Sequence, residues 1–339
     1  MPTECYLLAF IPPLPSGQSG KPDAPLGTIH YNPEVQLTLG NASWKSELGP
    51  YHIDMRPALL DYSEYRYGDF APNGLPLVGY GKKARHFCIN LAQFGFAIHD
   101  TWWFNREQIE YRNTLDALLD WFESNKEKTE QGTCWRVPFE NKKYGIPAGY
   151  PSAMAQGEII SFYTRMYQLT GKADLLNTAM DAFEFLKINI EQGGVRRKDE
   201  NGHIWLEEYP LKTPSYVLNG FIYTIFGLID LFRVTNNHQV KLEIDRCIVS
   251  LKAYLPKFSL WYWPIYDLHR KELIMTYYMR NVYIPQMQAL ACLFPDEPLF
   301  SATARRWEKQ NNPFNRLLAQ VMYRVQPRLR RWMCNQNPR

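Results

Sequence analysis

The sequence predicts a mainly helical protein: an α/α barrel, or toroid of antiparallel helix pairs, with a β-rich N-terminal portion. Apolar residues recur at helical spacing in a series of segments after Gly81. The loops between these segments alternate between short and long, as they do when helix pairs follow one another. With 339 residues, of which 45% are hydrophobic, the chain has ample material for a large core.

Residues 1–80 form the first predicted region, which is rich in Pro, Gly and Tyr. Short alternating runs at 28–31 and 35–39 favour strands and long loops here. The apolar start of the chain lacks a basic stretch before it and is interrupted by prolines, so it is a poor signal peptide. No stretch reaches the ~18 apolar residues that span a bilayer, so we expect no transmembrane segment.

Residues 81–312 form the predicted barrel. Helical spacing begins near Phe87 and Leu115 and continues in later segments, at 154–169, 173–190, 217–232, 240–254, 283–294 and 297–310. In the long loop before 217, Asn201-Gly202 lies between a polar and an apolar run and predicts a β-hairpin. The hairpin leads into WLEEYPLKTPSYVLNGF, residues 205–221, which we interpret as a catalytic loop held rigid by its prolines.

Residues 313–339 form a predicted basic C-terminal helix or tail. From Arg305 onward the chain has nine Lys or Arg residues against the single acid Glu308. Such a segment can bind an anionic polymer or an acidic membrane surface, or can simply be a solvated helix face.

Cofactor motifs are missing. The glycines of GLPLVGYG, residues 74–81, lack P-loop spacing, and no H-E-x-x-H or dinucleotide fingerprint occurs. The six scattered cysteines form no C-x-x-C pair, which argues against zinc and disulfides and favours a cytoplasmic location. KDENG at 198–202 is only a weak metal candidate. We therefore expect no cofactor, no metal and no nucleic-acid partner.

Several motifs resemble the C-terminal catalytic domain of D-glucuronyl C5-epimerases. They are AGYPSAMAQGEIISFYTRMYQLTG at 148–171, the E-E-Y-P, P-S and V-L-N-G-F elements of 205–221, IYDL at 265–268, and LFSATARRWEK at 299–309. With GLPLVGYG and INLAQFGFAIHD, the resemblance covers about residues 70–310. The β-rich module that interrupts the animal enzymes has no room here, so we expect a compact, bacterial form with altered outer subsites.

The resemblance implies an isomerase that converts D-glucuronic acid to L-iduronic acid within a heparosan-like polymer. The proton at C5 would be removed from one face of the sugar and returned from the other. Such a site needs a base, an acid on the opposite face, and cations or donors around the carboxylate. The implied partner is an anionic, uronate-containing polysaccharide, and relatives suggest a homodimer.

Tyr209 and Tyr266 are the implied acid/base residues, acting from opposite faces, with Glu208 orienting a partner. Strand alternation predicts that the neighbouring Glu207 faces solvent, and this argues against a glycosidase carboxylate pair. A tyrosine base with a pKa near ~10 needs a nearby cation to ionise. The family has an arginine three residues after the tyrosine of Y-D-L. Here His269 holds that position and Arg270 follows, so either can take the role.

The third family tyrosine falls in YYMRNVYIPQMQAL, residues 277–290. An ungapped match places Met279 there, whereas one inserted residue places Tyr278, which we choose over Tyr277 and Tyr283. The predicted substrate-binding residues are Tyr150, Gln156, Tyr216, Asn219, His269 and Arg280. Arg280 can grip a planar carboxylate. For Gln156 and Asn219, helix capping or loop bracing is an equal alternative.

Two other functions remain open at this point. A polysaccharide lyase forms the same C5 carbanion and then expels the C4 substituent. A protein that keeps the barrel but has lost the chemistry would still bind anionic glycans, and Met279 and His269 are the departures that favour it.

Overall fold

The computed structural model describes residues 35–59, 70–79 and 83–336, and the side chains of its last helix up to 326. Helices make up 57% of the described residues, which confirms the mainly helical class. The run expected at 28–31 lies outside the described residues. In the described part of the N-terminal portion, β1 (Thr38–Leu39) pairs antiparallel with β2 (Ile53–Asp54).

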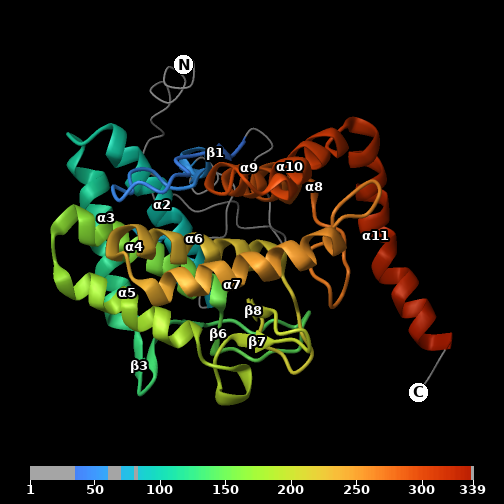
Figure 1. Ribbon diagram of the computed structural model, residues 1–339, viewed down its shortest axis with the longest axis horizontal. Helices are drawn as coiled ribbons and strands as arrows, with labels where there is room; N and C mark the ends of the chain where they lie inside the picture. The colour runs from blue at the N-terminus through green and yellow to red at the C-terminus, as the bar shows by residue number, and fades with distance from the viewer. Residues whose placement is uncertain (1–34, 60–69, 80–82, 337–339) are drawn as a thin grey trace.

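The helices form two layers (Figure 1). Three almost fully buried helices lie side by side in the order α2, α4, α6, with bounds Cys88–Phe104, Ala153–Thr170 and Leu218–Thr235. Each packs against an amphipathic partner, respectively α3 (Ile109–Asn125), α5 (Ala173–Leu186) and α7 (His238–Tyr254). A further pair is α9 (Ile284–Leu293) and α10 (Pro298–Gln310). Helix pairs are thus present, and their closure into a ring stays a prediction.

Glycines allow α4 and α6 to cross closely. A Cβ atom on Gly157 would lie 2.4 Å from the Cα of Thr224, and one on Gly227 would lie 2.0 Å from the Gly157 carbonyl oxygen. No side chain fits at these distances. The close crossing brings together the N-terminal ends of both helices, where the loops with the predicted site residues are attached.

Short elements connect the helices. The paired strands are β3 (Glu127–Thr129) with β4 (Gly132–Cys134), β5 (Arg136–Val137) with β6 (Tyr150–Pro151), and β7 (Arg196–Lys198) with β8 (Ile204–Leu206), all antiparallel. The remaining short helices are η1 (Arg56–Ala58), η3 (Ile190–Gln192), η4 (Leu255–Phe258), α8 (Thr276–Tyr278) and the π-helical η5 (Met279–Tyr283).

The Asn201-Gly202 turn joins β7 to β8. The carboxylate of Asp199 closes it by accepting hydrogen bonds from the backbone N–H groups of Asn201 and His203 and from the Tyr254 hydroxyl. Hydrogen bonds to the charged form hold the pKa of Asp199 at about 2, against the opposing effect of burial. Asp199, the first acidic residue of KDENG, therefore serves to hold the turn.

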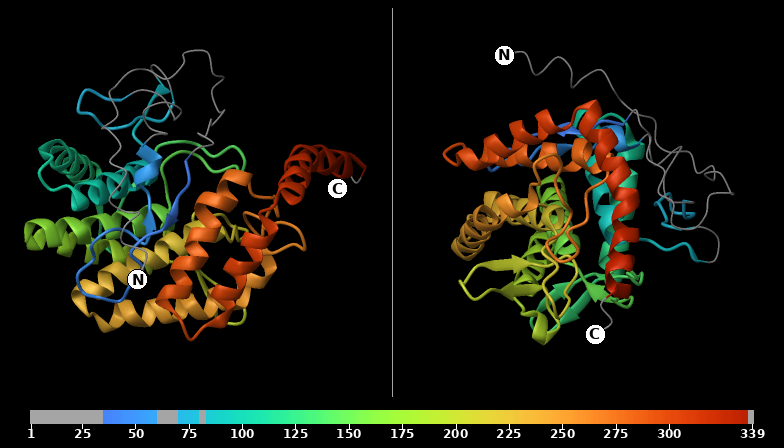
Figure 2. Two further views of the ribbon diagram at one scale, coloured as in Figure 1. Left: turned by 90° about the horizontal axis from the view of Figure 1, so that it is seen from above. Right: turned by 90° about the vertical axis from the view of Figure 1, so that its right-hand side faces the viewer.

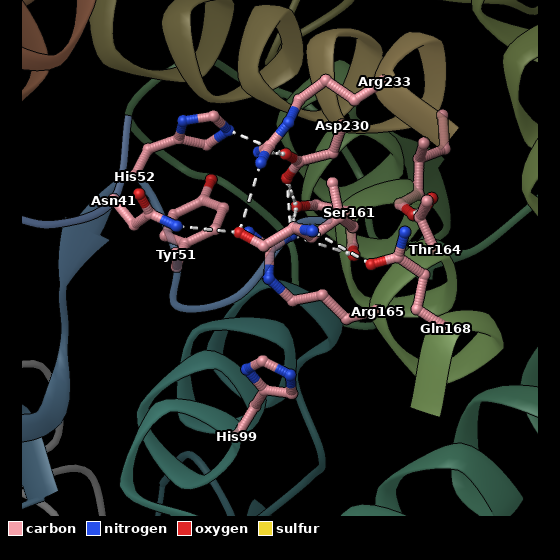
Figure 3. Close-up of polar contacts among 12 residues, drawn as sticks. Asn41, Tyr51, His52, His99, Ser161, Thr164, Arg165, Gln168, Asp230 and Arg233 are labelled. Carbon is pink, nitrogen blue, oxygen red and sulfur yellow. Dashed lines mark hydrogen bonds and ion pairs between the residues drawn. The ribbon is translucent and has the colours of Figure 1, made fainter. Parts of the chain in front are cut away.

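A buried charge network joins the helix layer to the N-terminal segment (Figure 3). Asp230 of α6 is fully buried, and Figure 3 shows three cationic or titratable side chains directed at it. His52 Nε2 lies 3.0 Å, Arg233 Nη1 2.9 Å and Arg165 Nη1 2.5 Å from its carboxylate oxygens. Asp230 is twelve residues from the start of α6, or roughly 18 Å along its axis, so this network lies far from the loop before that helix.

Helix α6 has the length and composition of a membrane span, but 83% of its apolar window is buried inside the fold, as in the core helix of a helical domain. The last helix, α11 (Pro313–Gln336), projects from the body (Figures 1 and 2).

Candidate active site

Glu207 anchors the loop between β8 and α6. Its carboxylate is fully buried and accepts hydrogen bonds from the backbone N–H groups of Ser215 (3.1 Å) and Tyr216 (3.0 Å) and from the Ser215 hydroxyl. Arg197 Nε lies 3.2 Å from the same carboxylate. The prediction that Glu207 faces solvent is therefore wrong. Strand alternation no longer applies, because β8 ends one residue earlier, at Leu206.

Glu208 lies on the loop before α6, and its side chain packs against the first turn of that helix, so that only 5% of its surface is exposed. A Cβ atom on Gly220 would lie 2.5 Å from Glu208 Oε2, so the glycine leaves the space that the carboxylate occupies. The loop thus holds the Glu208 carboxylate against the N-terminal turn of α6, at the base of a tyrosine cluster.

Tyr209 and Tyr266 both reach this carboxylate. Tyr266 Oη donates to Glu208 Oε1 at 3.2 Å, and a hydrogen bond also links Tyr209 to Glu208. The two hydroxyl oxygens are 3.4 Å apart. A sugar ring cannot fit between groups at that distance, so the expectation that these tyrosines flank opposite faces of a uronate does not fit this geometry.

Backbone bonds bring the IYDL segment to the loop. Leu218 N–H donates to the Tyr266 carbonyl at 3.3 Å, and Tyr266 N–H donates to the Glu272 carbonyl at 2.7 Å. The buried Tyr283 hydroxyl donates to the carbonyls of Ile265 and Tyr266. Tyr283, an alternate for the third tyrosine, therefore has a bracing role.

Burial controls the acidities at this cluster. It raises the pKa of Glu208 to about 7, partly offset by hydrogen bonds from the two tyrosines and by the charge of Lys143. Burial and the adjacent Glu208 raise the pKa values of Tyr209 and Tyr266 well above the ordinary value. Neither tyrosine therefore has the lowered pKa that we expected: both hydroxyls stay protonated near neutral pH, and the Glu208 carboxyl is the group with a pKa near neutrality.

A cavity of about 190 Å³ opens above the cluster. Its lining includes Tyr209, Tyr266 and Tyr278 together with Lys143 and Glu272. Lys143 Nζ lies 2.5 Å from Glu272 Oε2 and 5.2 Å from the centre of the Tyr266 ring. Among the described residues that line this cavity, Lys143 is the one cation. The cavity is thus small and has an ammonium group and a carboxylate, those of Lys143 and Glu272, beside the acid–base cluster.

Tyr278 lines the cavity and is followed by an irregular helical segment. Its ring meets that of Tyr266 edge to face, with centroids 6.1 Å apart. The next residues, Met279–Tyr283, form a π-helical turn, which accommodates one extra residue within a helix. The turn gives a physical reason for the single-residue insertion that places Tyr278, rather than Met279, at the family position. Met279 is fully buried.

His269 and Arg270 lie at the edge of this cluster. His269 is exposed, and its ring centre is 6.4 Å from that of Tyr144. Arg270 Nε donates to Glu272 Oε1 at 2.7 Å, and its Nη1 donates to the Lys143 carbonyl at 3.0 Å. Arg270 thus supports the Lys143–Glu272 pair, which lines the cavity, whereas the cavity lining includes neither His269 nor Arg270.

The other predicted substrate residues are placed around rather than in the cavity. Gln156 is fully buried. Its side-chain amide accepts a hydrogen bond from Trp135 N–H and donates one to the Trp135 carbonyl, so it braces the loop around Trp135. Asn219 lines a separate, smaller cavity of about 50 Å³, which Tyr277 and Tyr278 also line. Tyr216 packs against Trp205 and Tyr254.

Tyr150 and Arg280 complete the predicted set. The Tyr150 ring lies 6.1 Å from that of Tyr209, and burial raises its pKa. Arg280 Nη2 donates to the carbonyl of Val35 at 2.7 Å, which ties the N-terminal segment to η5.

Sequence reasoning missed the loop that carries Lys143 and Tyr144. The Tyr144 ring stacks on Tyr209 at 4.4 Å, and its hydroxyl donates to the buried Asp267 at 2.8 Å. NKKYG lies directly before the AGYPSAMAQG motif, and this proximity was the only signal. Tyr323 of α11 also lines the cavity, so α11 is in contact with the site.

Within the described ranges, no group of three or more His, Cys, Asp or Glu side chains could hold a metal ion.

These helix pairs carry an acid–base cluster in a small cavity with one ammonium group. Residues 129–309 match the family described as D-glucuronyl C5-epimerase C-terminus, and the chain belongs to this family. A D-glucuronyl C5-epimerase of Caenorhabditis elegans is 34% identical over 223 residues, covering 60% of this chain and 35% of that protein. An uncharacterized protein of Methanocaldococcus jannaschii is 28% identical over 158 residues, covering 42% and 51% respectively. The chain thus spans about a third to a half of the length of these curated relatives.

Solved structures with some likeness are more distant. A cellobiose 2-epimerase from Spirochaeta thermophila aligns with a TM-score of 0.48 and 14% identity over 66% of this chain and 58% of that one. A family 76 glycoside hydrolase from a Bacteroides thetaiotaomicron strain aligns with a TM-score of 0.44 and 13% identity over 67% and 47%.

Proposed function

We propose that this protein is a polysaccharide glucuronate C5-epimerase that converts D-glucuronate to L-iduronate in a heparosan-like chain. The observation that carries the proposal is the Glu208 carboxylate, with a pKa of about 7, bonded to two tyrosine hydroxyls at a cavity that contains the Lys143 ammonium. The family match supports the reaction, since C5 inversion is what its description names.

The first step would remove the C5 proton. The C5–H bond breaks as its proton moves to a tyrosine oxygen, Tyr209 or Tyr266, while that tyrosine passes its own proton to ionised Glu208. A base with a pKa near 7 combines a large ionised fraction with useful basicity at neutral pH. This relay avoids a free tyrosinate, which the raised tyrosine pKa values make unfavourable.

The electron pair left at C5 would spread onto the adjoining carboxylate. Lys143 is the residue placed to stabilise that charge, because its ammonium lies on the cavity wall beside the Tyr266 ring. Glu272 and Arg270 hold the lysine in position. Lys143 would thus do what the sequence suggested for Arg270, His269 or Arg280.

The second step would return a proton from the other face. Tyr278 is our candidate donor, because it lines the same cavity and is the residue chosen for the third tyrosine of the family. Its O–H bond breaks as the new C5–H bond forms, and solvent then reprotonates the Tyr278 oxygen and takes the proton from Glu208.

Other properties are proposed with the function. Inversion at C5 involves no net oxidation, so the reaction as written uses neither nicotinamide nor a metal. The catalytic unit would be residues 81–312 with α11 docked on it, preceded by the N-terminal portion. The proposed location is cytoplasmic, supported by the free thiols of Cys88, Cys134, Cys247 and Cys292. A homodimer is proposed on the family resemblance alone.

Product analysis of heparosan tests the reaction. After incubation and chemical depolymerisation, we expect iduronate-containing disaccharides and no new chain ends. Unsaturated, ultraviolet-absorbing ends would show a lyase instead. Glycan binding with neither product would show an inactive binding protein. Glu208→Gln, with its neutral amide, is the matched control and should form no iduronate.

A further inference from the structure

The outward face of α11 combines exposed apolar side chains with positive charge. Phe314, Leu317 and Val321 are 70%, 63% and 49% exposed. Their spacing of three and four residues places them along one face of the helix. Large apolar side chains gathered on one exposed helix face indicate an interaction surface.

The opposite face of α11 attaches the helix to the body. Ala319 is buried there, and Gln326 donates to the Lys271 carbonyl at 2.8 Å and accepts from Leu273 N–H at 3.3 Å. Tyr323 lines the 190 Å³ cavity. The helix is therefore docked by one face, and its apolar outer face is presented to solvent.

The positive charge of α11 indicates which kind of partner could bind this exposed face. Residues 313–336 contain five arginines and no aspartate, glutamate or lysine. Among the described side chains, Arg316 and Arg324 are exposed and lie near the apolar stripe in sequence. A second copy of α11 packed on this face would bring arginines against arginines, which disfavours self-association through it.

An anionic polysaccharide would satisfy the arginines but would leave Phe314, Leu317 and Val321 in water. An anionic lipid surface satisfies both parts: acyl chains accept the apolar side chains, and headgroup phosphates accept the guanidinium groups. We propose that α11 is an interfacial helix that docks this protein on anionic lipid bilayers. The proposal stands independently of the epimerase reaction.

Co-sedimentation of the full chain with vesicles tests the proposal. We expect binding to vesicles of phosphatidylcholine mixed with phosphatidylglycerol, little binding to pure phosphatidylcholine, and weaker binding as salt rises. Phe314→Ser/Leu317→Ser should reduce the affinity about tenfold or more, because two apolar anchors are lost. The matched control is Ile109→Ser/Val249→Ser, which changes side chains that are 60% and 58% exposed on other helices and should bind like wild type.

Several results would overturn the proposal. One is an absence of binding to the anionic vesicles, and another is an equal loss of affinity in the α11 variant and its control. A wild-type dimer that Phe314→Ser/Leu317→Ser converts to monomer, seen by light scattering, would assign the face to a second copy. Weaker binding of the same variant to heparosan without lipid would assign it to the polymer. Melting temperatures confirm that each variant is folded.

Discussion

The hydroxyl oxygens of Tyr209 and Tyr266 lie 3.4 Å apart, and both groups are hydrogen-bonded to Glu208. The two residues are 57 positions apart in sequence and act as one unit in space. In the proposed mechanism they form a shared proton relay on one side of the cavity. The following predictions depend on that relationship.

Replacing either tyrosine with phenylalanine removes only a hydroxyl group. We expect Tyr209→Phe and Tyr266→Phe each to lower kcat about 10²–10⁴-fold, the usual effect of losing one general acid or base. Because they belong to one relay, the double variant should be much less impaired than the product of the two single effects. Steady-state kinetics on heparosan checks this, and fully multiplicative losses would contradict a shared relay.

The pH dependence should follow Glu208. Its pKa is raised to about 7, so the ionised base accumulates only as pH rises through that value. We expect kcat/KM to increase up to about pH 7 and to level off above it. The same shift affects stability: the folded state holds this proton more tightly than the unfolded state, so Glu208 destabilises the fold increasingly as pH rises from its ordinary pKa toward 7.

Glu208→Gln separates these two effects. It should abolish turnover and remove the destabilisation that accompanies ionisation, so the variant should melt at a higher temperature than wild type above pH 7. Melting curves at several pH values measure this. Glu208 would be shown to ionise normally by either of two results. One is a kcat/KM that rises to its plateau well below pH 6, and the other is a melting temperature that depends on pH in the same way in wild type and in Glu208→Gln.

Lys143 is predicted to bind the uronate carboxylate. Lys143→Met removes the ammonium but keeps much of the apolar stem, and it should lower kcat/KM on heparosan by at least about tenfold. Lys142→Met is the matched control, since Lys142 is 83% exposed and pairs only loosely with Glu140 at 3.3 Å. Equal activity in the two variants would remove Lys143 from the site.

Two buried acids should respond in opposite ways to the same amide substitution. Asp230 is ionised among His52, Arg165 and Arg233, and these partners hold its pKa well below the ordinary value despite burial. Asp230→Asn should cost about 3–5 kcal/mol of unfolding free energy, since it leaves buried cations uncompensated. Burial raises the pKa of Glu158 well above its ordinary value, which favours the neutral form of this carboxyl. Glu158→Gln should therefore change stability by less than about 1 kcal/mol.

Denaturant unfolding at neutral pH measures both variants. The ion pairs of Asp230 contribute fully above its ordinary pKa, and this contribution is lost as pH falls through its lower folded value. The difference between wild type and Asp230→Asn should accordingly shrink in acid. A cost that does not depend on pH would contradict the role assigned to the Asp230 charge.

The sequence was sufficient to predict the helix pairs, because these depend on a local pattern, and motifs drew attention to Glu208, Tyr209 and Tyr266, which the structure brings together. The catalytic roles of these three residues stay predictions. The sequence could not place Lys143, whose partner Glu272 is far along the chain and is joined to it only by folding. It also failed for Glu207, because alternation describes a strand and this residue lies just beyond one. The spacing of two residues in the sequence does not determine how far apart their side chains lie, so the distance between the two tyrosine hydroxyls could not be predicted.

The most direct measurement is deuterium incorporation at C5 when heparosan is incubated with each variant in heavy water, read by NMR. If Tyr209 and Tyr266 serve one face and Tyr278 the other, then Tyr209→Phe and Tyr266→Phe will behave alike, and Tyr278→Phe will behave differently. One of these two groups will retain exchange at C5 without inversion, because the intact face still removes and returns the proton. If instead Tyr209→Phe and Tyr266→Phe give opposite results, with exchange retained in one and lost in the other, the two hydroxyls act on opposite faces and the one-sided relay is contradicted.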